Sequence, residues 1–491
     1  MPDDATTACA TTDNAPAYNA PADDTQAGNA PADDTQAGNA PADDTQAGNA
    51  PADNAPADDT QAESAQAENT PTYDATTYDA TTDREEYMVG TTGPEGATSV
   101  PSIETARDEL VARAAALRPL LRECAARGDA DRAVPKEVVD ALAQAGVFRL
   151  LTPRRFGGYE TDLRTLTEVS EALGEGDGSA AWVGMIISVT NWLACLFPDQ
   201  AQEDVFGADP DARVTGVAAP TGVGERVPGG WRVTGRWSYN SGAPYATWAA
   251  VGALLRDADG SVRDQALVLI PASELVVEDT WRMAGMRGTA GNTLVGQNVF
   301  VPEHRVLSVP AAAEGVYPRS DRDEALYGAA FGPMLLLCLV GPLLGLGKAA
   351  LDTVVEAAGT KPLAFTVHGR QADSVGVQTQ VAQAALRWET ARLLAYQAVD
   401  EVDRGVVGPL EYATRAHVRA RAGYAAQQVV EAINTLLDVH GSSAFADDGP
   451  LQRIWRDANT AARHAGLVPA VGLEVYGKSL LGVQDRVSLM V

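Results

Sequence analysis

The spacing of apolar residues divides the chain into a helical region, a β region and a second helical region. From residue 103 to about residue 197, apolar side chains recur every three or four positions, which predicts amphipathic helices. Asp177 and Ser179 are typical of a helix start. The helices expected here cover residues 103–126, 136–145, 163–173 and about 178–196.

Residues 212–309 change to a period of two, which is typical of strands. Residues 231–237 alternate between apolar and polar side chains, and apolar runs at 248–255 and 266–270 are separated by Gly and Pro. This pattern predicts an antiparallel β-barrel or sandwich. After Pro310 the helical spacing returns in four long stretches, typical of a four-helix bundle. These stretches are residues 324–359, 370–404, 410–440 and 451–481.

These patterns predict an α+β chain with an N-terminal helical domain (101–210), a central β-domain (211–310) and a C-terminal bundle (320–491). The first 100 residues differ, because residues 21–50 repeat one ten-residue polar unit three times. That segment carries 20 acidic residues against a single basic one, and it has few large apolar side chains to offset the entropy of ordering. We therefore expect a disordered acidic tail that aids solubility.

Charge and cysteine content exclude several classes of function. The remaining residues contain 46 acidic and 36 basic side chains, so no basic surface for nucleic acid is expected. The four cysteines have no metal-ligand spacing, and three of them lie in apolar helical contexts, which indicates buried thiols and no metal site. The apolar run 331–346 is shorter than a bilayer span, so we expect a buried helix, no membrane and a cytoplasmic protein.

Four segments carry a resemblance to a known family. In their order and spacing they resemble the acyl-CoA dehydrogenase superfamily over about residues 103–485, and within it the two-component flavin-dependent monooxygenases. The segments are residues 145–158, 230–243, 280–289 with 301–305, and 451–466.

The dehydrogenase base is missing from both of its usual positions. By spacing from the pair Arg456-Asp457, the catalytic Glu of the dehydrogenases falls at Ala465, and the alternative position falls near Met334. Neither residue can abstract a proton, which favours oxygen chemistry on a flavin. Two alternatives stay open at this point, namely an acyl-CoA dehydrogenase or oxidase with a relocated base, and a non-catalytic scaffold.

The resemblance implies a hydroxylase that receives reduced flavin, FMNH₂ or FADH₂, from a separate reductase and uses O₂. It implies a C4a-peroxyflavin, a small aromatic, polycyclic or amine substrate, and a homotetramer. Arg outnumbers Lys by 33 to 4, which is compatible with a high-GC bacterial source. A natural-product pathway is the setting we expect.

The resemblance also implies three catalytic positions, His464, Ser241 and Asn191. His464 lies seven residues after Asp457, which predicts that the two lie on one helix face, two turns apart. A neutral or protonated imidazole there could act on the oxygenated flavin or on the substrate. The simpler interpretation of His464 is a packed bundle histidine, and that of Ser241 is a turn serine.

The cofactor contacts implied by the resemblance lie in three segments. The strand 215–221 would line the flavin ring, where small side chains permit close approach. Trp237 could equally be a core aromatic. Arg370 and Gln378, in the bundle, could instead lie on a solvent-exposed helix face that contacts no cofactor. The positions expected at the cofactor, the last two from a neighbouring subunit, are Ala218, Thr221, Trp237, Ser238, Arg370 and Gln378.

Overall fold

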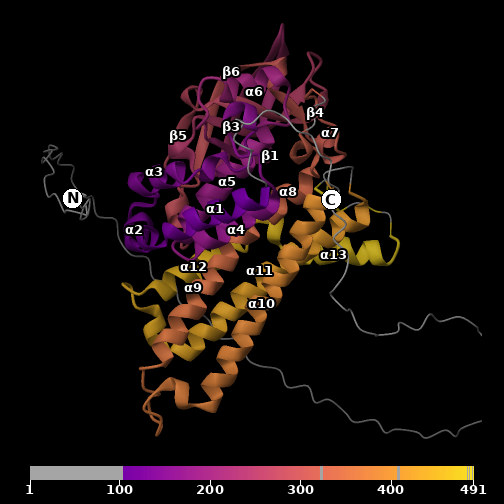
Figure 1. The fold of residues 1–491 in the computed structure, drawn as a ribbon. Helices are drawn as coiled ribbons and strands as arrows, with labels where there is room; N and C mark the ends of the chain where they lie inside the picture. The colour runs from indigo at the N-terminus through magenta and orange to yellow at the C-terminus, as the bar shows by residue number, and fades with distance from the viewer. Residues whose placement is uncertain (1–102, 321–323, 406–409, 484, 486, 489) are drawn as a thin grey trace, which may run out of the picture. The chain divides into compact units, whose positions relative to one another are not determined.

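A computed structural model describes residues 103–320, 324–405, 410–483, 485, 487–488 and 490–491. The expected acidic tail lies outside the described residues. The described residues belong to one compact unit. Figure 1 shows its helices and strands in the order that the sequence predicts, helices first, then the sheet, then long helices. The α+β, acyl-CoA dehydrogenase-like fold class is therefore confirmed.

The N-terminal helices follow the predicted positions, with one break. Residues 103–126 form two helices instead of one, because Pro119 in the first turn of the second has no amide hydrogen to continue the first. Asp177 caps its helix by accepting a hydrogen bond from the amide of Ala180. The helices are α1 (Ile103–Ala116), α2 (Arg118–Asp131), α3 (Lys136–Gln144), α4 (Leu163–Gly174), α5 (Gly178–Ala194) and α6 (Asp199–Phe206).

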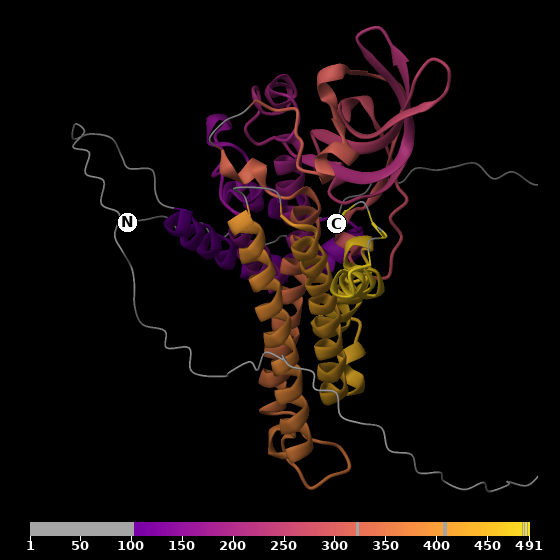
Figure 2. The same cartoon turned by 90° about the vertical axis from the view of Figure 1, so that its right-hand side faces the viewer.

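The central region is a single seven-stranded sheet in the order β5-β6-β2-β1-β3-β4-β7. It curls so that β4 approaches β6, as Figure 2 shows. The sequence predicted a wholly antiparallel sheet. The observed sheet is mixed, because β1 and β3 pair in parallel. The strands are β1 (Val214–Val227), β2 (Gly230–Asn240), β3 (Trp248–Arg256), β4 (Val262–Pro271), β5 (Val276–Glu278), β6 (Asn292–Pro302) and β7 (Val306–Ser308).

Two of the four long bundle helices are interrupted at prolines. Pro342 lies in the first turn of α9, and Pro469 is the first residue of α13. A proline cannot donate a hydrogen bond to the preceding turn, so each marks a new helix. The elements are α7 (Val309–Ala313), α8 (Phe331–Leu337), α9 (Val340–Ala358), α10 (Val375–Arg404), α11 (Tyr412–His440), α12 (Pro450–Ala461) and α13 (Pro469–Leu480).

The apolar run that the sequence assigned to the core is buried, as predicted. By length and composition, Phe331–Ala358 could cross a membrane, but 83% of its most apolar window is covered by the folded chain. Cys124, Cys195 and Cys338 are buried and form no disulfide among the described residues, also as predicted.

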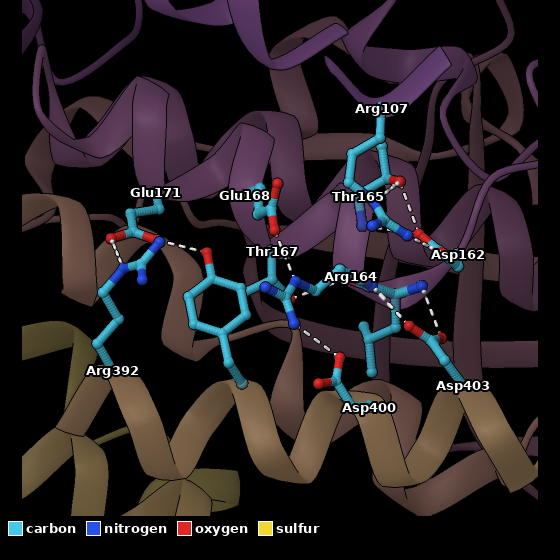
Figure 3. A network of polar contacts seen from close by, with 12 residues as sticks. Arg107, Asp162, Arg164, Thr165, Thr167, Glu168, Glu171, Arg392, Asp400 and Asp403 are labelled. Carbon is cyan, nitrogen blue, oxygen red and sulfur yellow. Dashed lines mark hydrogen bonds and ion pairs between the residues drawn. The ribbon is translucent and has the colours of Figure 1, made fainter. Parts of the chain in front are cut away.

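Polar side chains fix α4 against α10. Asp403 of α10 accepts hydrogen bonds from the amides of Leu163 and Arg164, both at 2.9 Å, at the beginning of α4 (Figure 3). The Arg164 side chain reaches back to Asp400 at 2.8 Å. The first amides of a helix have no partner within the helix, so a carboxylate from another element can satisfy them. These contacts join the N-terminal helices to the bundle.

Helices α4 and α9 cross closely because both have glycine at the crossing point. A Cβ on Gly345 would overlap the carbonyl oxygen of Glu171 and the Cα of Gly174. The glycine-rich sequence 341–347 therefore serves close packing between helices.

Replacing Gly345 by Ala is expected to destabilise the fold by about 1–3 kcal/mol, because the added methyl overpacks the crossing. Gly477→Ala in α13 is the matched control, since a Cβ there meets nothing within 4 Å. That change should stabilise by about 0.5–1 kcal/mol through helix propensity. Urea unfolding measures both. Equal changes in the free energy of unfolding for Gly345→Ala and Gly477→Ala would contradict close packing at the crossing of α4 and α9.

Candidate functional site

Helix α5 forms the centre of the candidate site. It lies between the sheet and the bundle (Figure 1), and Ile186 is its only residue with partial exposure. Trp182 and Thr190 lie one turn before and after Ile186 on the same face. This face therefore borders a space that solvent can reach.

His464 lies on the bundle side of this face. Its ring lies beside the indole of Trp182, with centroids 5.9 Å apart. Helix α12 ends at Ala461, and His464 precedes a 3-10 turn at Ala465–Leu467. The predicted shared helix face with Asp457 is therefore wrong, since the chain leaves the helix between these two residues.

The hydrogen bonding of His464 defines its neutral tautomer. Its Nδ1 accepts a hydrogen bond from the amide of Gly466 at 3.1 Å, so the proton of the neutral ring is on Nε2. Desolvation lowers the pKa of His464 below 6.5, although its side chain is exposed to solvent. Near neutral pH the ring is therefore uncharged and offers an Nε2–H donor.

Ser241 lies on the sheet side of α5. The carbonyl oxygen of Ser241 accepts a hydrogen bond from Thr215 Oγ1 at 2.9 Å, which joins the end of β2 to the start of β1. A Cβ on the next residue, Gly242, would contact Val183 and Ile187 of α5 at 3.4 Å. The chain at Gly242, next to Ser241, and the ring of His464 therefore both lie against α5, near the consecutive residues Val183 and Trp182.

Strand β1 bulges where the sequence predicts a flavin-lining segment. The register pairs Val217 with Val251 and resumes with Gly222 opposite Ala253, so residues 218–221 face a single β3 residue, Gly252. The β1–β2 register begins only at Val223. The side chains of 218, 219 and 221 are exposed, so small residues and backbone form an open shelf.

Ser238 lies near this shelf on β2. Its side chain is exposed, and its hydroxyl is 3.1 Å from Thr293 Oγ1 of β6. Across the strand pair, Thr221 Oγ1 donates to the carbonyl oxygen of Arg236 at 2.8 Å. Ala218, Thr221 and Ser238 are thus brought together on neighbouring strands.

Two predicted site residues are buried in structural positions. Trp237 is fully buried, its indole N–H donates to Gly252 O at 2.7 Å, and three glycines make room for its ring. The geometry favours the core-aromatic interpretation over a flavin contact. Asn191 donates to Phe148 O and Ala212 O and accepts from the amide of Val214. Its polar atoms are therefore engaged in joining α5 to β1.

Arg370 and Gln378 are remote from the other predicted residues of this chain. Arg370 lies in the connection between α9 and α10, and Gln378 lies in the first turn of α10. Figure 2 shows this connection at the end of the bundle opposite the sheet. Helix α10 has 30 residues, which corresponds to roughly 45 Å. Both side chains are exposed, and Arg370 pairs with Asp373 at 2.6 Å. Within one copy of the chain they therefore do not join the other predicted residues.

Sequence reasoning missed residues that complete the site. In the sequence, Trp182 and Ile186 look like any other apolar residue of α5. Because α5 is apolar on all sides, its sequence does not indicate which face lies toward His464. Leu336 and Leu339 also approach, since a Cβ on Gly466 would touch both. Asp457 was noted only as part of a motif, although its carboxylate accepts a hydrogen bond from the amide of Met286. Such contacts across domains have no fixed sequence spacing.

The His464 ring is expected to titrate below pH 6.5 with its neutral proton on Nε2, because desolvation opposes its charge and Nδ1 accepts from Gly466. Ring ¹⁵N chemical shifts followed by NMR against pH, with His464→Gln for assignment, measure both. The unfolded chain binds this proton more readily, so stability should fall as pH drops through and below 6.5. A ring proton on Nδ1 at neutral pH would contradict the assignment.

Comparison with known proteins identifies the family. Residues 107–204 match the family model "Acyl-CoA dehydrogenase, N-terminal domain", and residues 337–469 match "Acyl-CoA dehydrogenase, C-terminal domain". The oxygenase subunit HsaA, a flavin-dependent monooxygenase of Rhodococcus jostii, is 34% identical over 371 residues, which cover 75% of this chain and 97% of the relative.

Two further proteins support the assignment. The oxygenase component of an FADH₂-dependent resorcinol hydroxylase from a Rhizobium species is 32% identical and covers 77% of this chain and 95% of its own length. The structure of XiaF from a Streptomyces species in complex with FADH₂ and glycerol is 36% identical, with a TM-score of 0.74 over 79% of this chain and 98% of XiaF. The chain belongs to the acyl-CoA dehydrogenase superfamily, in its group of flavin-dependent monooxygenase oxygenase components.

Proposed function

We propose that this chain is the oxygenase component of a two-component flavin-dependent monooxygenase that hydroxylates a small aromatic substrate. The observation that carries the proposal is that the neutral imidazole of His464 and the segment Ser241–Gly242, which offers a hydroxyl, both lie against α5. Where the dehydrogenases have a catalytic carboxylate, the chain has Ala465. The site therefore offers hydrogen-bond donors and lacks the thioester base at that position.

The residues on the sheet side fit a reduced flavin, FMNH₂ or FADH₂. The β1 shelf exposes backbone and small side chains to which a flat ring system can come close, and Ser238 lies at its edge. Beside Ser241, the side-chain oxygen of Asn240 is buried without a hydrogen-bond partner. When bound, reduced flavin supplies the two electrons with which one atom of O₂ enters the substrate and the other leaves as water.

The protein's own contribution is to hold protons and exclude water. The Nε2–H of His464 is placed to donate a hydrogen bond, and the Ser241 hydroxyl supplies a second donor from the sheet side. Trp182 and Leu336 form apolar walls beside His464. Apolar side chains around the reacting centre keep water away, which reduces the release of hydrogen peroxide before the oxygen is transferred to the substrate.

The relatives define the partners that we propose. A protein named as an oxygenase component works with a separate reductase, so we infer a reductase that delivers the flavin. Resorcinol, in the name of one relative, is a phenol, and we propose an aromatic substrate with a hydroxyl or amine for this chain. A cytoplasmic, bacterial natural-product pathway is the setting we propose.

His464→Ala and Ser241→Ala are each expected to raise the ratio of hydrogen peroxide to hydroxylated product at least about tenfold, since each removes a donor at the reacting centre. The measurement mixes protein, chemically reduced FMN or FAD, O₂ and a set of phenols, and quantifies both products. Ser261→Ala, in an exposed β3–β4 turn, is the matched serine control and should change nothing. Wild-type protein that makes only peroxide with every phenol, and oxidises an acyl-CoA, would support the dehydrogenase alternative.

We further propose a homotetramer that associates through the bundle. Along α10, Val375, Leu386 and Leu393 are 74%, 62% and 60% exposed and lie on one face. An apolar stripe of this kind is typical of a helix that another subunit covers. In such an assembly Arg370 and Gln378 could reach the flavin of a neighbouring copy.

The double substitution Leu386→Glu with Leu393→Glu is expected to reduce the mass in solution, because charges replace the stripe. Light scattering after gel filtration measures the mass. Val262→Glu, 53% exposed on β4, is the control and should leave the mass unchanged. A wild-type chain that is monomeric would contradict the proposal.

A further inference from the structure

A strained loop lies between the bundle and the sheet. Residues 286–290 include two non-glycine residues in the left-handed region, Met286 with φ 52° and Ala290 with φ 47°. Such residues persist only where their surroundings hold them in place. The contacts that hold this loop therefore determine what it can position.

Helix α12 holds the loop on both sides of Met286. A carboxylate oxygen of Asp457, which is 2% exposed, accepts the hydrogen bond of the Met286 amide. The Arg456 guanidinium donates to the carbonyl oxygen of Ala284. Between them, a Cβ on Gly285 would overlap the carbonyl oxygen of Arg456, so only glycine fits. The backbone of the loop is thus fixed to the helix that leads to His464.

The loop in turn holds the end of β2. The carbonyl oxygen of Met286 accepts hydrogen bonds from Trp281 Nε1 at 2.9 Å and from Thr289 Oγ1 at 2.8 Å. The carbonyl oxygen of Thr289 accepts the amide of Gly242 at 2.8 Å. Gly242 directly follows Ser241. A continuous series of hydrogen bonds therefore runs from Asp457 to the residue beside the Ser241 hydroxyl.

We propose that Asp457 is a positioning residue that sets the place of Ser241 relative to His464. It acts through the Met286 amide, the Thr289 carbonyl and the Gly242 amide, and it touches neither flavin nor substrate. One helix, α12, then determines both donors, since His464 follows its C-terminal end and Ser241 is tied to its middle. The inference rests on the proposed function for its catalytic consequence, but its structural part stands alone.

Asp457 does not need a negative charge to hold the Met286 amide. Burial and the neighbouring Asp177 raise the pKa of Asp457 to about 7. The hydrogen bond from Met286 needs only an acceptor oxygen, which Asn also supplies. Asp457→Asn therefore keeps the connection, whereas Asp457→Ala breaks it.

Asp403 provides a matched control. Like Asp457 it is a bundle aspartate that accepts backbone amide hydrogen bonds from another element, here at the start of α4. Burial raises its pKa to about 7 as well. Asp403→Ala should therefore cost stability in a similar way without touching the connection to Ser241.

The experiment measures hydrogen–deuterium exchange of the flavin-free protein, and the peroxide released per reduced FMN or FAD oxidised. Asp457→Ala should speed exchange about tenfold or more at residues 286–290 and at Gly242, because a buried amide loses its partner. It should also raise the share of peroxide. Asp457→Asn should stay within about twofold of wild type in both, and Asp403→Ala should speed exchange only at the start of α4.

The proposal is overturned if Asp457→Ala lowers stability as Asp403→Ala does but leaves exchange at Gly242 and the peroxide share unchanged. If Asp457→Ala does not fold, Thr289→Val weakens the same path, since it removes the hydroxyl bond to Met286 and leaves the amide bond at 3.2 Å. Faster exchange at Gly242 supports the proposal, and unchanged exchange there overturns it. Wild-type protein that hydroxylates no phenol would count against the proposed function, while the exchange data would still decide whether Asp457 positions Gly242.

Discussion

The burial of α5 is the constraint on which the remaining structure depends. Its 17 residues include no charged side chain, and its polar groups find partners inside the protein, as when Ser188 donates to Val147 O at 2.6 Å. A helix that is apolar on all sides must be covered on all sides. The N-terminal helices, the sheet and the bundle each supply one wall, so their separate site residues meet at the same helix.

This arrangement explains why the chemistry is divided between distant parts of the sequence. The sheet contributes a hydroxyl and a shelf of small residues, and the bundle contributes an imidazole. In the proposed function neither set is a site alone, because the flavin and the substrate need groups from both. The residue after His464 is Ala465, which has no carboxylate.

The sequence predicted the order of elements and most helix positions, because long periodic stretches report burial directly. It did not predict that β1 pairs in parallel with β3, since the pattern of one strand says nothing of its neighbours. Pro119, Pro342 and Pro469 were visible, yet the apolar spacing continues through all three, so the predicted helices were too long. The break before Ala465 separates His464 from the helix face of Asp457. Ser241 was placed only by resemblance, and its surroundings depend on contacts from α5 and from residues 286–290 that have no sequence signature.

The bulge of β1 has a consequence for the stability of the folded chain. The strand registers on both sides skip residues 218–221, and the side chains of 218, 219 and 221 are exposed. A ligand held by this surface binds the folded chain and not the unfolded one, and its occupancy adds to the free energy of unfolding by mass action. A flavin bound at this surface would therefore make the folded chain harder to unfold, to a degree that grows with its occupancy.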